Sequence, residues 1–188
     1  MEINKKSAVA PEKLKGTKTE TNLHTAFSAE TQAYIRYKIF ENKAKEDGYE
    51  AVAELFKKTA DNEMEHAEVW FRYLGGACAT EHNLDAAAKG EKFEWSKMYS
   101  RFAEEARAEG FKTIGDIFER IASVEKTHED GFKKLLDTVK KGEMFTSKAD
   151  STKWLCIKCG YVVFAKEPPK TCPACSHPQG FFKNVSKR

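Results

Sequence analysis

Residues 50–74 read EAVAELFKKTADNEMEHAEVWFRYL, and residues 112–136 read KTIGDIFERIASVEKTHEDGFKKLL. Both stretches place apolar residues at steps of three and four, the period of an amphipathic helix. Each also carries Glu-x-x-His, as Glu63 with His66 and as Glu125 with His128. This spacing sets a carboxylate and an imidazole on one helix face, and here that face is in phase with the apolar stripe. The two stretches therefore predict both the fold and its site.

Each stretch is the second half of a helical hairpin, and the two hairpins repeat one another. Four pairs of residues recur 62 positions apart: Gly48 and Gly110, Phe56 and Phe118, Glu63 and Glu125, and His66 and His128. Glycines at 48, 75–76 and 110 interrupt the helical period, so residues 19–141 predict four helices. A longer connection, from 77 to about 89, joins the hairpins. Two hairpins joined by a crossover predict an all-α four-helix bundle.

The chain ends in a short, turn-rich module. Residues 143–153 lack a helical period and form a predicted linker, so we expect a helical domain at 1–148 and a separate β/turn module at 149–188. This module holds Cys156-x-x-Cys159 and Cys172-x-x-Cys175, and four thiolates at such spacing close a tetrahedral site around one metal. Zinc and iron both suit it. We expect Cys78, outside the module, to be a small residue after a helix end.

Composition excludes several classes of protein. Hydrophobic residues make up 40% and charged residues 32% of the chain, which suits amphipathic helices. We expect a cytoplasmic protein without a membrane segment, because the chain has no apolar run of about 18 residues and residues 1–18 lack a signal-peptide core. Residues 151–188 carry seven Lys/Arg and one Asp/Glu, but these lysines are scattered singly, so nucleic-acid binding is not expected.

Five carboxylates fall where a helical core would place leucine. They are Glu30, Glu63, Glu91, Glu94 and Glu125. Burial of each carboxylate alone would cost several kcal/mol, and the charge can be neutralised by protonation or by a bound cation. We favour a bound cation. All lie 15 to 19 residues from their hairpin glycine, or roughly 22–29 Å along the helix, so the donors converge on one level. Mixed oxygen and nitrogen donors suit iron or manganese.

We expect two metals at this level. Glu63 and Glu125 bridge them, Glu30 and His66 complete one, and Glu91 and His128 complete the other. On spacing alone Glu94 is either a further ligand or a solvated glutamate, while Tyr37 and Tyr99 are core aromatics or hydrogen-bond donors to the site. No ligand role is expected for five other polar residues: His24, Glu65, Glu68, Lys97 and Asp130.

The whole arrangement resembles the rubrerythrin family from about residue 19 to residue 182. The matching stretches are TNLHTAFSAETQAYIRY at 21–37, GEKFEWSKMY at 90–99, FAEEARAEGF at 102–111, CIKCGY at 156–161 and CPACSHPQGFF at 172–182. The resemblance implies a ferritin-like di-iron bundle followed by a rubredoxin-like module. Residues 1–18 form a longer start than is usual in the family, and we assign them no role.

The resemblance also implies an activity. Rubrerythrins are non-haem peroxidases that reduce hydrogen peroxide to water, with electrons passing from an external NAD(P)H-dependent reductase or a rubredoxin through the tetrathiolate iron. A homodimer is implied, in which that iron serves the partner's di-iron site. The implied metal ligands are Glu30, Glu63, His66, Glu91, Glu94, Glu125 and His128 for two irons, all seven catalytic, and Cys156, Cys159, Cys172 and Cys175 for one iron.

The family's Gly-Glu-x-x-Glu is matched by residues 90–94, which implies that Glu94 binds iron in the oxidised state and His66 in the reduced state. Tyr37 and Tyr99 match family tyrosines near the site. Iron is favoured over zinc at the cysteines, because a redox-active pair of irons needs a nearby electron carrier. Two alternatives remain: a ferroxidase or iron-binding protein, and an interaction module whose tail is a zinc ribbon.

Overall fold

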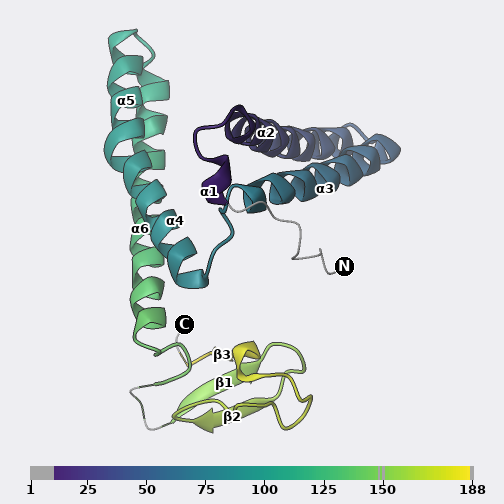
Figure 1. Cartoon of the computed structure of the whole chain (residues 1–188), viewed down its shortest axis with the longest axis vertical. Coiled ribbons are helices and arrows are strands. Elements are labelled where there is room, and N and C mark those ends of the chain that lie inside the picture. The colour runs from purple at the N-terminus through teal and green to yellow at the C-terminus, as the bar shows by residue number, and fades with distance from the viewer. Residues whose placement is uncertain (1–10, 148, 150, 187–188) are drawn as a thin grey trace. The chain divides into compact units, whose positions relative to one another are not determined.

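The computed structural model describes residues 11–147, 149 and 151–186, and it divides the chain into two compact units, Met1–Ala79 and Thr80–Arg188 (Figure 1). The first unit contains α1 (Pro11–Leu14), α2 (Lys18–Glu46) and α3 (Glu50–Tyr73). The helices of the second are α4 (Thr80–Phe93), the π-helical segment η1 (Glu94–Met98), α5 (Tyr99–Ala108) and α6 (Lys112–Lys140). Its remaining elements are β1 (Thr152–Cys156), β2 (Val162–Ala165), the 3₁₀ turn η2 (Gln179–Phe181) and β3 (Phe182–Asn184).

The predicted fold class is confirmed as a mostly helical chain with a small C-terminal strand region. Most of the predicted long start, residues 1–10, lies outside the described residues, as does residue 148 at the predicted domain boundary. No helix in the described part of the chain is long and apolar enough to span a membrane.

The two hairpin turns have the same backbone structure. Gly48 has φ +80° after α2, and the next amide, of Tyr49, donates to the carbonyl of Ala44 at 2.8 Å. After α5, Gly110 has φ +89°, and the amide of Phe111 donates to the carbonyl of Ala106, also at 2.8 Å. Glycine enters this left-handed region without a steric penalty, which explains why it ends both helices.

Equivalent aromatic side chains hold each hairpin together. In the first hairpin, the ring of Phe56 packs against Tyr37 and Phe40, with centroids 6.1 and 5.5 Å apart. The side chains 62 positions later make the same contacts at 5.9 and 5.6 Å: Phe118 with Tyr99 and with Phe102. The repeat seen in the sequence is therefore a repeat of packing as well as of motif.

The predicted connection between the hairpins is wrong over most of its length. Because α4 begins at Thr80, only residues 74–79 lie between α3 and α4. Residues 80–89 form a helix that packs on α6, with Ala88 buried. A hydrogen bond from Lys89 lowers the pKa of Asp85, and the charge of Lys140, at the end of α6, lowers it further. The sequence did not predict this helix because its buried residue is a small alanine and no stripe of large apolar side chains marks it.

The C-terminal strands form an antiparallel sheet in the order β2-β1-β3. Its core is the buried cluster of Trp154, Cys156, Cys172 and Phe182. Trp154 is 1% exposed, and its indole Nε1 donates to the carbonyl of Ala165 at 3.1 Å. The core is built around two of the cysteines, so the packing of the module positions its thiols.

Candidate metal sites

Three of the predicted ligands gather in the first hairpin. Glu30 of α2 and Glu63 and His66 of α3 bring one donor atom each within 4.8 Å of one another. His66 Nδ1 lies 3.1 Å from a carboxylate oxygen of Glu63 and 4.0 Å from one of Glu30. The hairpin turn sets this arrangement, because it places the α2 carboxylate beside the Glu-x-x-His face of α3.

The second hairpin repeats the cluster. Glu91 of α4 and Glu125 and His128 of α6 again bring their donor atoms within 4.8 Å. His128 Nδ1 lies 2.6 Å from Glu125 Oε2 and 3.7 Å from Glu91 Oε2. In both clusters the carboxylates are partly buried and the imidazole is half exposed.

These donor sets fit a divalent metal. Burial raises the pKa of Glu91, and the negative charge of Glu125 raises it further. A cation beside both carboxylates would offset that repulsion, and it would take the place of a proton on the imidazole Nδ1. Two carboxylates and an imidazole are a donor set that suits iron or manganese.

The π-helical segment explains how Glu91 becomes the counterpart of Glu30. Tyr37 and Tyr99 are 62 positions apart, but Glu30 and Glu91 are only 61 apart. The segment between Glu91 and Tyr99 therefore holds one extra residue, and the Tyr99 amide bonds to the Glu94 carbonyl, five residues back. A π turn accommodates such an insertion within a continuous helix, and these turns are frequent at functional sites.

Glu94, the first residue of that segment, lies outside the second cluster among the described residues, although its charge raises the pKa of Glu91. Tyr99 is close to the same carboxylates. Burial raises its pKa, and the charges of Glu94, Glu125 and Glu91 raise it further. Tyr37 packs on Phe56 and Phe40, at the equivalent place in the first hairpin.

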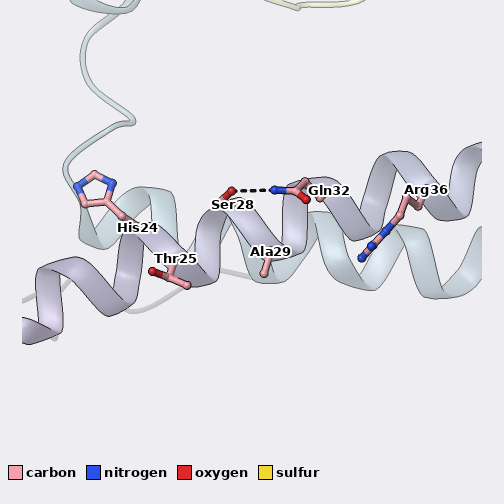
Figure 2. A pocket seen from close by; sticks show the side chains of 6 residues that line it. All are labelled: His24, Thr25, Ser28, Ala29, Gln32 and Arg36. Carbon is pink, nitrogen blue, oxygen red and sulfur yellow. Dashed lines mark hydrogen bonds between the residues drawn. The ribbon is translucent and has the colours of Figure 1, made fainter.

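The polar residues without a predicted ligand role lie outside both clusters in the described part of the chain. Glu68 pairs with Arg72, while Glu65, Lys97 and Asp130 are exposed. His24 lies with five other α2 residues in a polar pocket, where Gln32 Nε2 donates to Ser28 Oγ at 3.0 Å (Figure 2). None of its six residues belongs to the two clusters, and we assign the pocket no role.

One polar contact beside the second cluster was missed in the sequence. Glu129 follows His128, is 3% exposed, accepts a hydrogen bond from Trp95 Nε1 at 2.6 Å and pairs with Lys133. It thereby joins α6 to the π-helical segment, next to the proposed ligands of both. The Lys133 partner four residues on is the one sequence signal that could have drawn attention to it.

The four cysteines of the module form a third cluster. All are free thiols, and two pairs of sulfurs, Cys156 with Cys175 and Cys159 with Cys172, are each 3.7 Å apart. A disulfide would require about 2.05 Å. Sulfurs bound to one tetrahedral metal at about 2.3 Å would lie about 3.8 Å apart, so the arrangement fits a single ion. Cys156 and Cys172 are buried, and Cys159 is exposed.

Backbone amides prepare the first pair of cysteines for a metal. Burial raises the pKa of the Cys156 thiol, but hydrogen bonds from the backbone N–H groups of Cys159 and Lys158, together with those of the Cys159 and Cys175 side chains, lower it to about 6. The two Cys-x-x-Cys turns match, since the amides of Gly160 and Ser176 bond to the carbonyls of Cys156 and Cys172. Both Gly160 and Ser176 have positive φ, of 80° and 59°.

Comparison with known proteins covers both parts of the chain. The family model described as rubrerythrin matches residues 21–136, and the one described as rubrerythrin, rubredoxin-like domain, matches residues 154–183. The rubrerythrin of Porphyromonas gingivalis is 42% identical, over 97% of each chain. Rubrerythrin-1 of Clostridium acetobutylicum is 42% identical over 93% of this chain and 97% of its own. The rubrerythrin of Nitratidesulfovibrio vulgaris is 40% identical over 90% and 95%.

Proposed function

This chain belongs to the rubrerythrin family, with a ferritin-like helical part and a rubredoxin-like module, and on that premise we propose that it reduces hydrogen peroxide to water. The family consists generally of oxidoreductases. One observation carries the proposal: the helical hairpins hold two equivalent carboxylate and histidine clusters, and the same chain carries a four-cysteine cluster. A protein that only stores iron has no need of the cysteines.

We assign one iron to Glu30, Glu63 and His66 and a second to Glu91, Glu125 and His128, and Glu63 and Glu125 would be shared between the two ions. Glu94 would be a further ligand when the pair is oxidised, in place of His66. When bound, two ferrous ions supply the two electrons that cleavage of the peroxide O–O bond consumes. The chain's own residues would hold the ions, with the carboxylates partly buried and the imidazoles half exposed.

Reduction of one peroxide to two waters also consumes two protons, and Tyr99 is suited to assist there. A phenol is protonated at neutral pH, and the rise in the pKa of Tyr99 only strengthens this, so its O–H is available to donate a hydrogen bond. Its nearness to Glu94, Glu125 and Glu91 supports a role in orienting an oxygen of the substrate. Tyr37 is the equivalent donor in the first hairpin.

The four-cysteine module is the proposed electron entry. Cys156, Cys159, Cys172 and Cys175 would hold a single iron, which would supply one-electron transfer from a separate NAD(P)H-dependent reductase or a rubredoxin. We place the protein in the cytoplasm, where such cysteines stay reduced. We also propose that it forms a homodimer and that the boundary between its two domains lies between residues 148 and 149. Zinc in this module could not carry electrons, because zinc is not redox-active. A module without visible absorption would show that zinc, and not iron, is bound.

The test is anaerobic stopped-flow mixing of the fully reduced, iron-loaded protein with hydrogen peroxide and, separately, with oxygen. We expect fast oxidation by peroxide, slow oxidation by oxygen and three irons per chain. If oxygen oxidised the protein faster than peroxide did, and Fe(II) were consumed as a substrate, the protein would be a ferroxidase and not a peroxidase.

The same experiment with Glu94→Ala tests the role of that carboxylate. We expect the rate with peroxide to fall about tenfold or more, and the absorption of the oxidised iron pair to change, because an anionic ligand is lost. Glu65→Ala is the matched control, since it removes an exposed carboxylate from within the Glu63 to His66 motif. An unchanged rate and spectrum in Glu94→Ala would remove Glu94 from the site.

A further inference from the structure

We propose that each iron pair is enclosed by the first hairpin (α2–α3) of one chain and the second hairpin (α4–α6) of a second copy. Two chains that exchange hairpins in this way hold two iron pairs, each with ligands from both copies. The inference rests on the proposed two-iron function and adds the partner that completes the site.

Each hairpin leaves an equivalent apolar pair exposed in line with its cluster. Val52 and Leu55 are 44% and 65% exposed, and the residues 62 positions later, Ile114 and Ile117, are 47% and 46% exposed. Leu55 and Ile117 each precede the cluster histidine by 11 residues, which is three helical turns on the same face. Apolar side chains at matched places on two ligand-bearing faces indicate surfaces that cover one another.

The clusters on these faces are incomplete in the same way. Each offers three protein donors, and the side chains of His66 and His128 are 56% and 51% exposed. A pair of bridged metals needs both sets of donors at one level. The surface that completes one cluster is therefore the other hairpin, from the same chain or from a second copy.

The connection between the hairpins decides which copy supplies it. A ferritin-like bundle contains one long crossover, because its second and third helices run in the same direction. Tyr73, the end of α3, lies ten residues beyond Glu63, or about 15 Å. Thr80, the start of α4, lies 11 residues before Glu91, or about 16 Å. A crossover within one chain would therefore have to span about 31 Å along the bundle axis.

Residues 74–79 cannot span that distance. Seven Cα steps from Tyr73 to Thr80 reach at most about 25 Å when fully extended. Part of the segment is not extended, because the amides of Gly75 and Gly76 bond back to the carbonyls of Arg72 and Phe71 and close the end of α3. Unwinding α4 would lengthen the connection only by giving up its packing on α6.

A second copy removes the conflict. Each chain then contributes its first hairpin to one bundle and its second hairpin to the other. The short connection only has to pass from one bundle to the next, and it does not have to run back along the length of a single bundle. The exchange is reciprocal and closed, so it ends at two chains instead of growing into a filament.

Complementation between two damaged variants tests this. One full-length variant carries Glu63→Gln and His66→Gln, the other carries Glu125→Gln and His128→Gln, and each bears a different affinity tag. The two are co-expressed, and the mixed dimer is purified on both tags. Dimers of each variant with itself, also purified on two tags, are the controls. Iron is counted by elemental analysis after subtraction of the tetrathiolate iron, which is measured from its visible absorption.

We expect the mixed dimer to recover about half of the wild-type paired iron and the single-variant dimers to recover little, because exchange unites the two intact hairpins in one bundle. A mixed dimer with no more paired iron than its controls would overturn the exchange while leaving the wild-type function intact. Wild-type protein without paired iron would overturn both.

Lengthening the connection gives a second, independent readout. We expect an insertion of about 20 Gly and Ser residues between Gly75 and Gly76 to let each chain close its own bundle, since the effective concentration of its own hairpin then exceeds that of the partner's. The paired iron recovered in mixed dimers that carry this insertion in both chains should fall at least severalfold. Recovery that does not depend on the insertion would overturn the geometric argument.

Discussion

Single carboxylates in this protein differ in what offsets their burial. Glu41 is 3% exposed and receives hydrogen bonds from Lys38 and Lys45, both at 2.6 Å. These bonds, that of Lys38 first, lower the pKa of Glu41 from 4.5 to about 2. Among the described residues no lysine pairs with Glu91 in this way, and burial raises its pKa. A buried carboxylate that is paired with lysines, such as Glu41, therefore has a structural role, whereas one without such a partner, such as Glu91, is available to a metal.

Glu41→Gln should make the stability of the protein less sensitive to acid. The folded-state pKa of Glu41 lies below its unfolded value, so its stabilisation is fully present above about pH 4.5 and is lost as the pH falls towards 2. We expect the difference in unfolding free energy between wild type and Glu41→Gln to be largest near neutral pH and to shrink through this window. Denaturant unfolding at a series of pH values measures it.

Glu54→Gln is the control for that measurement, because Glu54 is an exposed glutamate of α3. Loss of metal in acid affects both variants alike and cancels from their difference. A wild-type advantage over Glu41→Gln that stays constant down to pH 2 would contradict the assignment.

Among the elements, the π-helical segment has the largest effect on the site. Its one extra residue changes the register between Glu91 and Tyr99, and the indole of Trp95 within it is fixed by Glu129. A regular helix at this place would rotate the residues before it by about 100° relative to those after it. Glu91 would then no longer face Glu125 and His128.

Deletion of Lys97 removes the extra residue, so it should leave Glu91 in the second cluster. Lys97 is exposed and lies within the π-helical segment, and its loss allows a regular helix in which Glu91 precedes Tyr99 by seven positions, as Glu30 precedes Tyr37. We therefore expect the paired iron and the far-UV circular dichroism of the deletion variant to stay close to those of wild type. Lys97→Ala, which keeps the chain length and the π turn, is the control; loss of paired iron in the deletion variant alone would show that the π turn does more than absorb the extra residue.

At the level of the whole molecule, the sequence predicted what repeats. Hairpin glycines, aromatic packing residues and Glu-x-x-His motifs recur at a fixed interval, and each of these local features is present in both hairpins of the structure. The cysteine cluster was predictable for the same reason, since two Cys-x-x-Cys turns constrain four thiols within a few residues.

Features without a local signature were not predictable. The start of α4 was missed because its buried residue, Ala88, is small, and the π turn was missed because an inserted residue leaves no mark in composition. The hydrogen bond from Trp95 to Glu129 joins residues 34 positions apart, beyond any helical period. All three depend on tertiary packing, which a single sequence does not reveal.

The uneven exposure of the four thiols has a consequence for the lifetime of the protein. Cys156 and Cys172 are shielded, whereas Cys159 faces water at the surface of a protein whose proposed substrate is an oxidant. Sulfur oxidation follows thiolate character and access, so excess peroxide should convert Cys159 to its sulfinic or sulfonic acid first and release the ion. Peptide mass spectrometry after graded peroxide exposure would detect this order, and damage that began at Cys156 or Cys172 would refute it. Oxidative inactivation would then begin in the electron-transfer module, while both helical clusters were still intact.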